Sequence, residues 1–216
     1  MDAVTIPASN SIRNDRHGSR LRRLAIGVAG VSAIALSLAT PLFSGTPALA
    51  NPRHFFVNST DDRPDGNPGD GQCRTATAPF VCTLRAAVQE SNALGGDYIV
   101  DVPAGAYRLT RIGDGADAGA WGDLDITAPI EISGAGVGLV MVDGITQDRV
   151  FDVHSNYTSI HDLSVDNGYT YQSNGGCVRI NDGADLVLDH VYIKNCTAVE
   201  GFGGGIDRMP KRVDQG

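Results

Sequence analysis

The chain has 216 residues, of which 42% are hydrophobic and 19% are charged, and its formal net charge at pH 7 is −8. Residues 51–216 hold 12 Lys or Arg and 23 Asp or Glu, so the formal charge of this part alone is −11. Such an acidic surface argues against nucleic acid and anionic lipid as partners, and it is compatible with cation binding. A length of about 165 residues is enough to bury one hydrophobic core.

Residues 1–50 have the order that is typical of a secretory signal peptide. Five arginines precede an apolar run at 24–39, and Ala48 and Ala50 form an A-x-A cleavage site. The alternative is an uncleaved transmembrane anchor, but the run is short for a bilayer span of about 20 residues, and Pro41 follows it. We therefore expect cleavage after Ala50, a location outside the cell or at its surface, and no transmembrane span in the mature chain.

Residues 51–96 are predicted to form an N-terminal cap with one helix. "HFFVNST" at 54–60 is typical of a short strand, and the Asp/Gly/Pro-rich stretch "NSTDDRPDGNPGDGQC" at 58–73 ends it. A helix is predicted over 83–94, where Thr83 can cap the first free N–H groups and Gly95 can end the last turn.

All four cysteines follow residue 50. An even number in an oxidising compartment favours disulfides over a metal site. Proximity in the sequence favours a Cys73–Cys82 bridge, which leaves Cys177 and Cys196 as the second pair.

The Asp/Gly/Pro-rich stretch also offers hard oxygen ligands for calcium. The candidates are Asp61, Asp62, Asp65, Asn67 and Asp70. Their spacing does not match an EF-hand, and Asp and Asn side chains in such a stretch commonly bond to their own backbone. We favour a solvated turn, and we expect no cofactor, with Ca²⁺ as the alternative.

Residues 97–206 are predicted to form the coils of an all-β parallel solenoid. The segments "VGLVMVDG" at 137–144, "IHDLSVDN" at 160–167 and "LDHVYIKN" at 188–195 each have apolar residues at the first, fourth and sixth places. "GGCV" at 175–178 recurs 28 residues later as "GGGI" at 203–206. Such a period places equal positions above one another, so that stacked coils bury a continuous apolar ladder. The open ends of this stack need a cover, and the helix at 83–94 is expected to close the first one.

Several polar residues recur at the same offset. His161 is expected beside Asp189, and Asp162 beside His190. We interpret this alternation as an exposed cross-strand ladder, with acid–base catalysis as the alternative. Asn167 and Asn195 are expected to hydrogen-bond along their own ladder. His54 and His154 have no predicted partner, and a second acidic loop holds Asp114, Asp117, Asp123 and Asp125.

Two stretches resemble a known family. "FFVNSTDDRPDGNPGDGQC" with "CTLRAAVQESNAL" resembles the N-terminal CSLREA domain of secreted bacterial proteins, except that Ala86 stands where the motif has Glu. The segments from "GGDYIVDVPAGAYRLT" onward resemble the right-handed parallel β-helix that usually follows this domain, and the "GGCV" and "GGGI" corners resemble repeats of polymorphic outer-membrane proteins. The resemblance spans nearly all of 54–206.

The resemblance implies an exported, non-catalytic β-helix scaffold of the adhesin type, which would bind an extracellular polysaccharide or a cell-surface ligand. The competing hypothesis is a polysaccharide lyase or glycoside hydrolase with the pectate-lyase-like β-helix. The basic residues are few and scattered in the sequence, which argues against a lyase. No nucleophile elbow, zinc-protease motif, Walker loop or dinucleotide fingerprint is present.

Residues 207–216, "DRMPKRVDQG", differ from the coils before them. They hold three basic residues and no run of inward apolar side chains. The sequence therefore predicts an atypical tail, which is expected from a truncated chain, with a hydrophilic C-terminal cap as the alternative.

Overall fold

The computed structural model describes residues 53–113 and 119–210, so the predicted signal peptide and the loop residues Asp114 and Asp117 lie outside the described residues. The described part belongs to one compact unit, which is mostly β and contains one helix, α1 (Leu84–Ala93). In chain order, its strands are β1 (Arg53–Phe56), β2 (Tyr98–Val102), β3 (Gly105–Arg108), β4 (Leu124–Ile126), β5 (Ile130–Gly134), β6 (Val140–Asp143), β7 (Phe151–Val153), β8 (Thr158–Asp166), β9 (Tyr169–Tyr171), β10 (Val178–Ile180), β11 (Leu186–Lys194), β12 (Thr197–Val199) and β13 (Ile206–Arg208).

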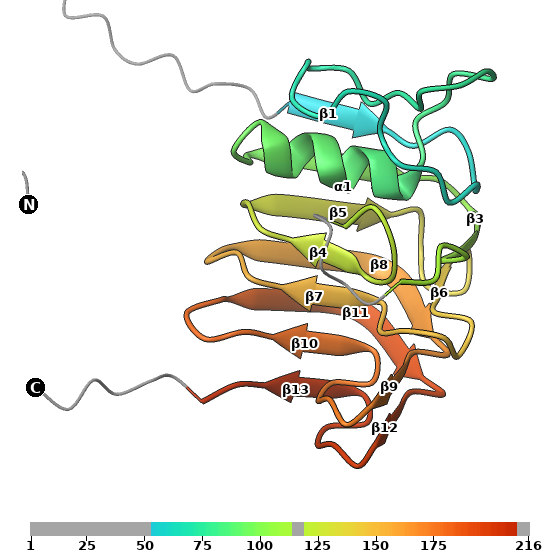
Figure 1. The fold of residues 1–216 in the computed structure, drawn as a ribbon. Coiled ribbons are helices and arrows are strands. Elements are labelled where there is room, and N and C mark those ends of the chain that lie inside the picture. Colours follow the sequence, from blue (N-terminus) through green and yellow to red (C-terminus); the bar gives the residue numbers. More distant parts are fainter. Residues whose placement is uncertain (1–52, 114–118, 211–216) are drawn as a thin grey trace, which may run out of the picture. The chain divides into compact units, whose positions relative to one another are not determined.

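All strand pairs between these elements are parallel, and they join consecutive coils (Figure 1). One sheet runs through β1, β2, β5, β8 and β11; β6 pairs with the second half of β8, and β3 pairs with β6. A second sheet has the order β4–β7–β10–β13, and β9 pairs with β12. The chain therefore forms about four turns of a parallel β-solenoid, which confirms the predicted β-helix.

The repeat read from the sequence is present in the strand register. Leu188, Val191 and Ile193 of β11 pair with residues 28 positions earlier in β8, and Val178 of "GGCV" pairs with Ile206 of "GGGI". Gly175 and Gly203, at the same corner of successive coils, have φ of 69° and 65°. A side chain is strained in this left-handed region, which explains why the corner repeats as glycine.

One of the three repeats was aligned wrongly at its start. Val140 and Val142 stand above Leu163 and Val165 as predicted, but Ile132 of β5, and not Val137, pairs with Ile160. Residues 135–139 loop out between β5 and β6, because the two short strands together cover the length of the continuous strand β8. Such a loop changes which residue pairs with Ile160 of β8, but it keeps the spacing between Val140 and Val142 after the loop.

Inward side chains form columns through the stack. Val100, Ile132 and Ile160 lie in one column and are fully buried, and Leu188 continues the column in the last coil. Burial of such a side chain contributes roughly 1.5–3 kcal/mol, so that the stability of each coil depends on its neighbours.

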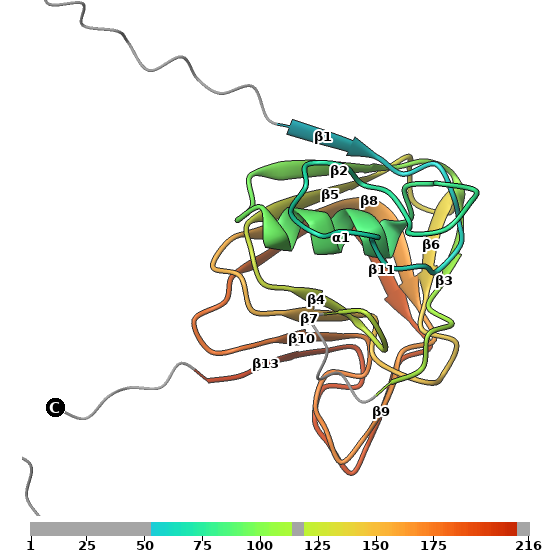
Figure 2. The same ribbon diagram turned by 45° about the horizontal axis from the view of Figure 1, so that its top comes forward.

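Helix α1 covers the first end of the stack, as predicted (Figure 2). Leu84, Ala87 and Val88 are buried, and the hydroxyl of Thr83 accepts a hydrogen bond from the N–H of Ala86 at 3.0 Å. Ala86 therefore keeps the backbone half of the capping interaction without the Glu of the motif, whose loss should cost about 1 kcal/mol or less. Strand β1 of the predicted cap pairs with β2, so the cap also supplies the first strand of the main sheet.

Both predicted disulfides are present, and no cysteine is free. Cys73–Cys82 closes the cap loop. Cys177–Cys196 joins the residue before β10 to the turn between β11 and β12.

Strand β13 continues to Arg208, two residues beyond the predicted end of the coils. The described residues contain no helix that is both long and apolar enough to cross a membrane.

Candidate functional site

The outer face of the β4–β7–β10–β13 sheet carries a row of charged side chains. β4, β7 and β10 have the pattern apolar–charged–apolar, and β13 begins in the same way with Ile206 and Asp207, so the middle residue of each strand points away from the core. The register places Asp125, Asp152, Arg179 and Asp207 beside one another on successive coils. Two like charges side by side are unfavourable unless cations neutralise them.

Arg149 and Arg179 supply that positive charge. Arg179 binds Asp152 through two nitrogens, with Nε donating to Oδ1 at 2.9 Å. Arg149 is buried, donates from Nε to Oδ2 of Asp123 at 2.8 Å, and lies 3.7 Å from Asp152. Two basic residues that lie on different coils therefore meet in one place.

A pocket of about 370 Å³ opens beside this row. We call it the Asp–Arg pocket; its lining includes Asp123, Asp148, Arg149, Asp152, Tyr169, Thr170, Tyr171, Ser173 and Arg179. Tyr171 is 56% exposed at the pocket and Thr170 is buried. The pocket thus combines hydrogen-bond acceptors, donors and aromatic rings.

The carboxyl groups of this pocket differ in acidity. Burial and the neighbouring Asp123 charge raise the pKa of Asp148 to about 6, although the N–H of Arg149 donates to it at 2.7 Å. Burial also raises the pKa of Asp123, against the attraction of Arg149. Burial opposes the ionisation of Asp152 too, but the hydrogen bond from Arg179 and the charge of Arg149 outweigh it and hold the pKa of Asp152 below its usual range.

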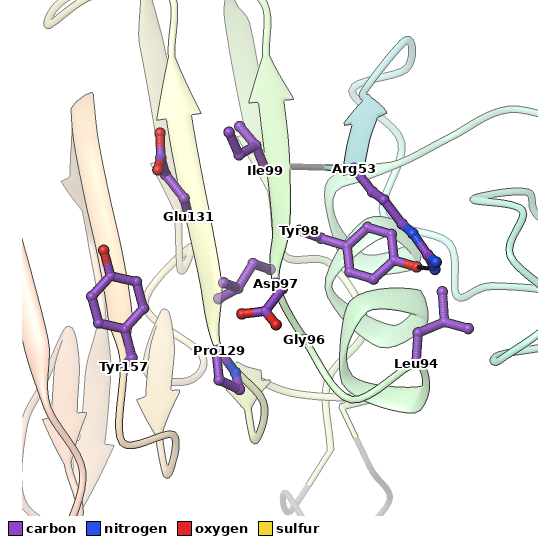
Figure 3. Close-up of a pocket in the computed structure, with 10 residues that line it drawn as sticks. Arg53, Leu94, Gly96, Asp97, Tyr98, Ile99, Pro129, Glu131 and Tyr157 are labelled. Carbon is purple, nitrogen blue, oxygen red and sulfur yellow. Dashed lines mark hydrogen bonds between the residues drawn. The ribbon is translucent and has the colours of Figure 1, made fainter. Parts of the chain in front are cut away.

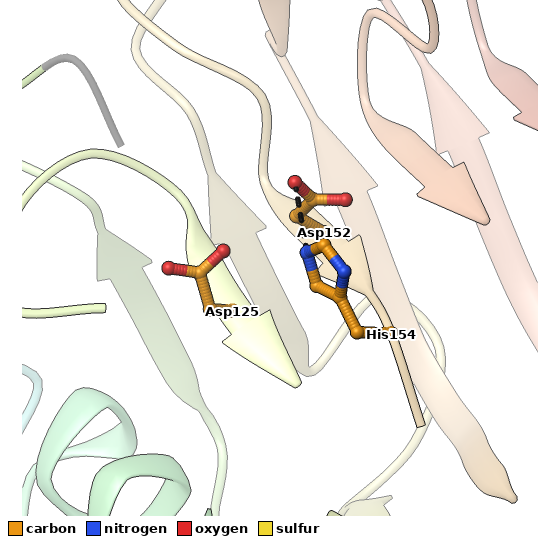
Figure 4. Close-up of side chains that lie close together, drawn as sticks. All are labelled: Asp125, Asp152 and His154. Carbon is orange, nitrogen blue, oxygen red and sulfur yellow. Dashed lines mark ion pairs between the residues drawn. The ribbon is translucent and has the colours of Figure 1, made fainter. Parts of the chain in front are cut away.

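Asp125, Asp152 and His154 place one potential ligand atom each within 4.8 Å of one another (Figure 4). Nε2 of His154 lies 3.4 Å from Oδ2 of Asp152, so this histidine has a partner that the sequence did not predict. Carboxylate and imidazole are suitable ligands for a divalent metal. However, Arg179 binds both oxygens of Asp152, and Asn181 also donates to Oδ1 at 2.5 Å. The arrangement fits a neutralised ion network better than a metal site.

A second hollow, of about 560 Å³, lies near the first end of the main sheet (Figure 3). Arg53, Tyr98, Glu131 and Tyr157 are among its lining residues. Arg53 donates to the hydroxyl of Tyr98 at 2.7 Å, so these two polar groups bind each other. The hollow offers a weaker case for chemistry than the Asp–Arg pocket, where several charged side chains converge.

The predicted His/Asp alternation exists on the outer face of β8 and β11. His161 pairs with Asp189 in the register, and His190 lies 3.9 Å from Asp162. His161 sits between Asp162 and Glu131, each 3.0 Å away; burial lowers its pKa, but these two hydrogen bonds prevail and raise it. The geometry agrees with a cross-strand ladder, since His161, Asp162, Asp189 and His190 line neither the Asp–Arg pocket nor the hollow near Arg53. His54 also has a partner, Asp101, at 2.6 Å.

The asparagine ladder was predicted with the wrong partners. Nδ2 of Asn167 donates to Asp143 at 3.0 Å, and Nδ2 of Asn195 donates to Asp166 at 2.8 Å. Each Asn therefore bonds to an Asp of the preceding coil, because the carboxylate is a stronger acceptor than an amide.

The five candidate calcium ligands do not all converge on one point. Asp62 binds the buried guanidinium of Arg85, and Asp61 lies 3.2 Å from Arg63. Asp65 accepts from the N–H groups of Asn67 and Arg74, both at 2.8 Å. The remaining pair is Asn67 and Asp70, where Asp70 accepts from the N–H of Gln72 at 2.8 Å. These bonds agree with the turn interpretation, and calcium binding, the alternative, is left to be measured.

Sequence reasoning missed Asp148, Arg149, Asp152 and Arg179. A usable signal existed in the triplets "LDI", "FDV", "VRI" and "IDR", which recur with spacings of 27, 27 and 28 residues. Their middle residues form the charged row.

Comparison of the chain with protein-family models, curated proteins and solved structures found no match, so the family resemblance remains a prediction.

Proposed function

We propose that this chain is an exported β-solenoid scaffold that binds an extracellular or cell-surface carbohydrate in the Asp–Arg pocket. The observation that carries the proposal is the set of ion-paired Asp and Arg side chains beside Tyr169 and Tyr171 in one open pocket. A concave site with a few convergent polar groups and shifted acidities is the preferred place for a ligand.

The fixed geometry of the pocket supports binding. Arg149 reaches Asp123, Asp152 and the carbonyl of Asn174, so its guanidinium is held in place before a ligand arrives. Preorganised groups lose little conformational freedom on binding, which increases affinity. Sugar hydroxyls both donate and accept hydrogen bonds, so they match a site that offers carboxylates and guanidinium groups together.

Binding should be measured by titration calorimetry against a panel of neutral and acidic polysaccharides. We expect Tyr171→Ala to weaken the binding by about tenfold or more, because the ring lies at the pocket and is exposed. Tyr157→Ala is the matched control, since Tyr157 is equally exposed at 57% but lines the other hollow. Loss of binding in Tyr157→Ala alone would move the site to that hollow, and no binding by the wild-type chain would refute the proposal.

A second candidate function is glycoside hydrolysis, which the opposite pKa shifts in this pocket favour. A protonated Asp148 could donate its proton to the leaving glycosidic oxygen, while the ionised Asp152 could accept a proton from the attacking water. Catalysis would then fall as the pH rises through about 6, the pKa of Asp148.

Release of reducing ends measures this activity directly. Asp148→Asn should abolish it and leave binding within about threefold, because the amide keeps the shape but cannot donate an acid proton. Binding without any release of reducing ends at pH 4–8 would reject hydrolysis and retain the scaffold proposal.

A further inference from the structure

In the described part of the chain, the last coil presents a strand edge that no other strand covers. Strand β11 pairs with β8 on one side, and no strand in the described ranges pairs with its other side. Its inward residues Leu186, Leu188, Val191 and Ile193 are only partly buried, although their partners in β8 are fully or almost fully buried. Two of its outward residues, Val187 and Tyr192, are 54% and 66% exposed.

The side chains of β11 are self-complementary in the antiparallel direction. Asp189 and His190 both point outward, and His190 has φ of 49°, so the strand is divided into two arms. When a second copy of β11 is related to the first by a twofold axis that passes between these two residues, the first arm of each strand lies opposite the second arm of the other. Only this register places all four inward residues opposite inward residues, because any other shift moves part of the apolar set to the outer face.

Every pair in this register is favourable. On the inner side, Leu186 faces Ile193 and Leu188 faces Val191 of the second copy. On the outer side, Val187 faces Tyr192, and Asp189 faces His190. One residue before the strand, Asp185 faces Lys194, which is the last residue of β11. Because of the twofold symmetry, each of these pairs occurs twice.

We infer that β11 is a docking edge for a second copy of this chain, and that two solenoids join end to end through antiparallel β11 strands. The contact covers the open apolar columns and supplies partners for the free backbone groups of the edge. It also buries the methyl groups of Val187 against the ring of Tyr192 from the second copy. The charges favour a second copy in this register, because Asp185 meets Lys194 there twice. Within its own chain, Asp185 pairs with Arg208 at 2.7 Å and Lys194 lies 3.3 Å from Asp166, so the docked charges would extend existing ion pairs.

Analytical ultracentrifugation of the purified chain tests the dimer, and a charge exchange tests its register. Lys194→Glu places Glu opposite Asp185 twice, and Asp185→Lys places Lys opposite Lys194 twice, so each variant alone should dimerise at least about tenfold more weakly than the wild type. An equimolar mixture of the two variants restores both opposite-charge pairs. It should form a heterodimer with an affinity within about threefold of the wild type.

The mixture separates docking from folding, because a misfolded variant cannot be rescued by another one. Arg108→Glu is the matched control: Arg108 and Lys194 end their strands in the same row, and each pairs with an Asp of a neighbouring coil. Only Lys194 lies on the open edge, so Arg108→Glu should dimerise normally. A wild-type chain that stays monomeric at about 1 mM would overturn the inference. A dimer that is indifferent to both single variants, or variants that the mixture does not rescue, would overturn the register.

Discussion

The two ends of the coil stack are built on opposite principles. At the first end, α1 lies over the apolar columns, and the guanidinium of Arg85 is fully buried between Asp62 and the carbonyl groups of Gly119 and Gly122. At the other end of the described coils, the apolar columns reach the surface at β11. A repeated coil can continue a stack but contains nothing that ends it, so that closure requires residues outside the repeat.

Hydrogen bonds hold the closed end together. The buried carboxylate of Glu90, on α1, accepts from the N–H groups of Gly69 and Gly71 in the cap loop. Arg85 joins the same helix to the loop that leads into β4. The cap therefore depends on a few buried charges, whereas the coils depend on many small apolar contacts.

The largest effect is expected at Arg85. Arg85→Met removes the guanidinium and leaves the carboxylate of Asp62, which is 2% exposed, without its charged partner. Breaking such a buried pair costs about 3–5 kcal/mol, and urea unfolding should show this loss. Arg108→Met is the control, because Arg108 is 67% exposed and its ion pair with Asp143 should contribute at most about 1 kcal/mol. Equal losses in the two variants would contradict the role of Arg85 as the central contact of the cap.

A smaller difference is expected within one column of the core. Ile160 and Leu188 are register partners, but Ile160 is fully buried and Leu188 is not. Ile160→Ala should cost about 2–5 kcal/mol, and Leu188→Ala should cost less than half as much in the monomer. Unfolding must be measured at a concentration where the chain is monomeric, because a dimer would cover Leu188. Equal losses at low concentration would show that the last coil is covered by residues other than those of a second copy.

The comparison also explains what the sequence could predict. The solenoid, the helix position and the 28-residue register follow from recurring apolar residues and glycine corners, because identical positions in stacked coils have identical surroundings. The charged pocket was harder to predict, since Asp123, Arg149 and Arg179 belong to different coils and meet only after stacking. Arg85 gave no periodic signal, because its partners lie in two loops far from it in the sequence.

The smallest effect is expected from calcium, at the same loop that the cap holds in place. The carboxylate of Asp65 is largely buried and already accepts two backbone N–H groups, and burial raises its pKa. Asp70 and Glu90 accept N–H groups of the same loop in a similar way. Carboxylates that are saturated by the backbone have few free lone pairs for an ion that requires six to eight oxygen ligands.

The melting temperature should therefore be the same in millimolar Ca²⁺ and in chelator. A specific site would stabilise the folded chain by about 2.7 kcal/mol at a hundredfold excess over Kd, which is readily detected by calorimetry. Asp65→Ala should lower the stability by about 1–3 kcal/mol with or without calcium, because it leaves the N–H groups of Asn67 and Arg74 without their acceptor. A calcium-dependent rise of several degrees that disappears in Asp65→Ala would instead establish a metal site in the cap, and the first end of the stack would then depend on an ion as well as on Arg85.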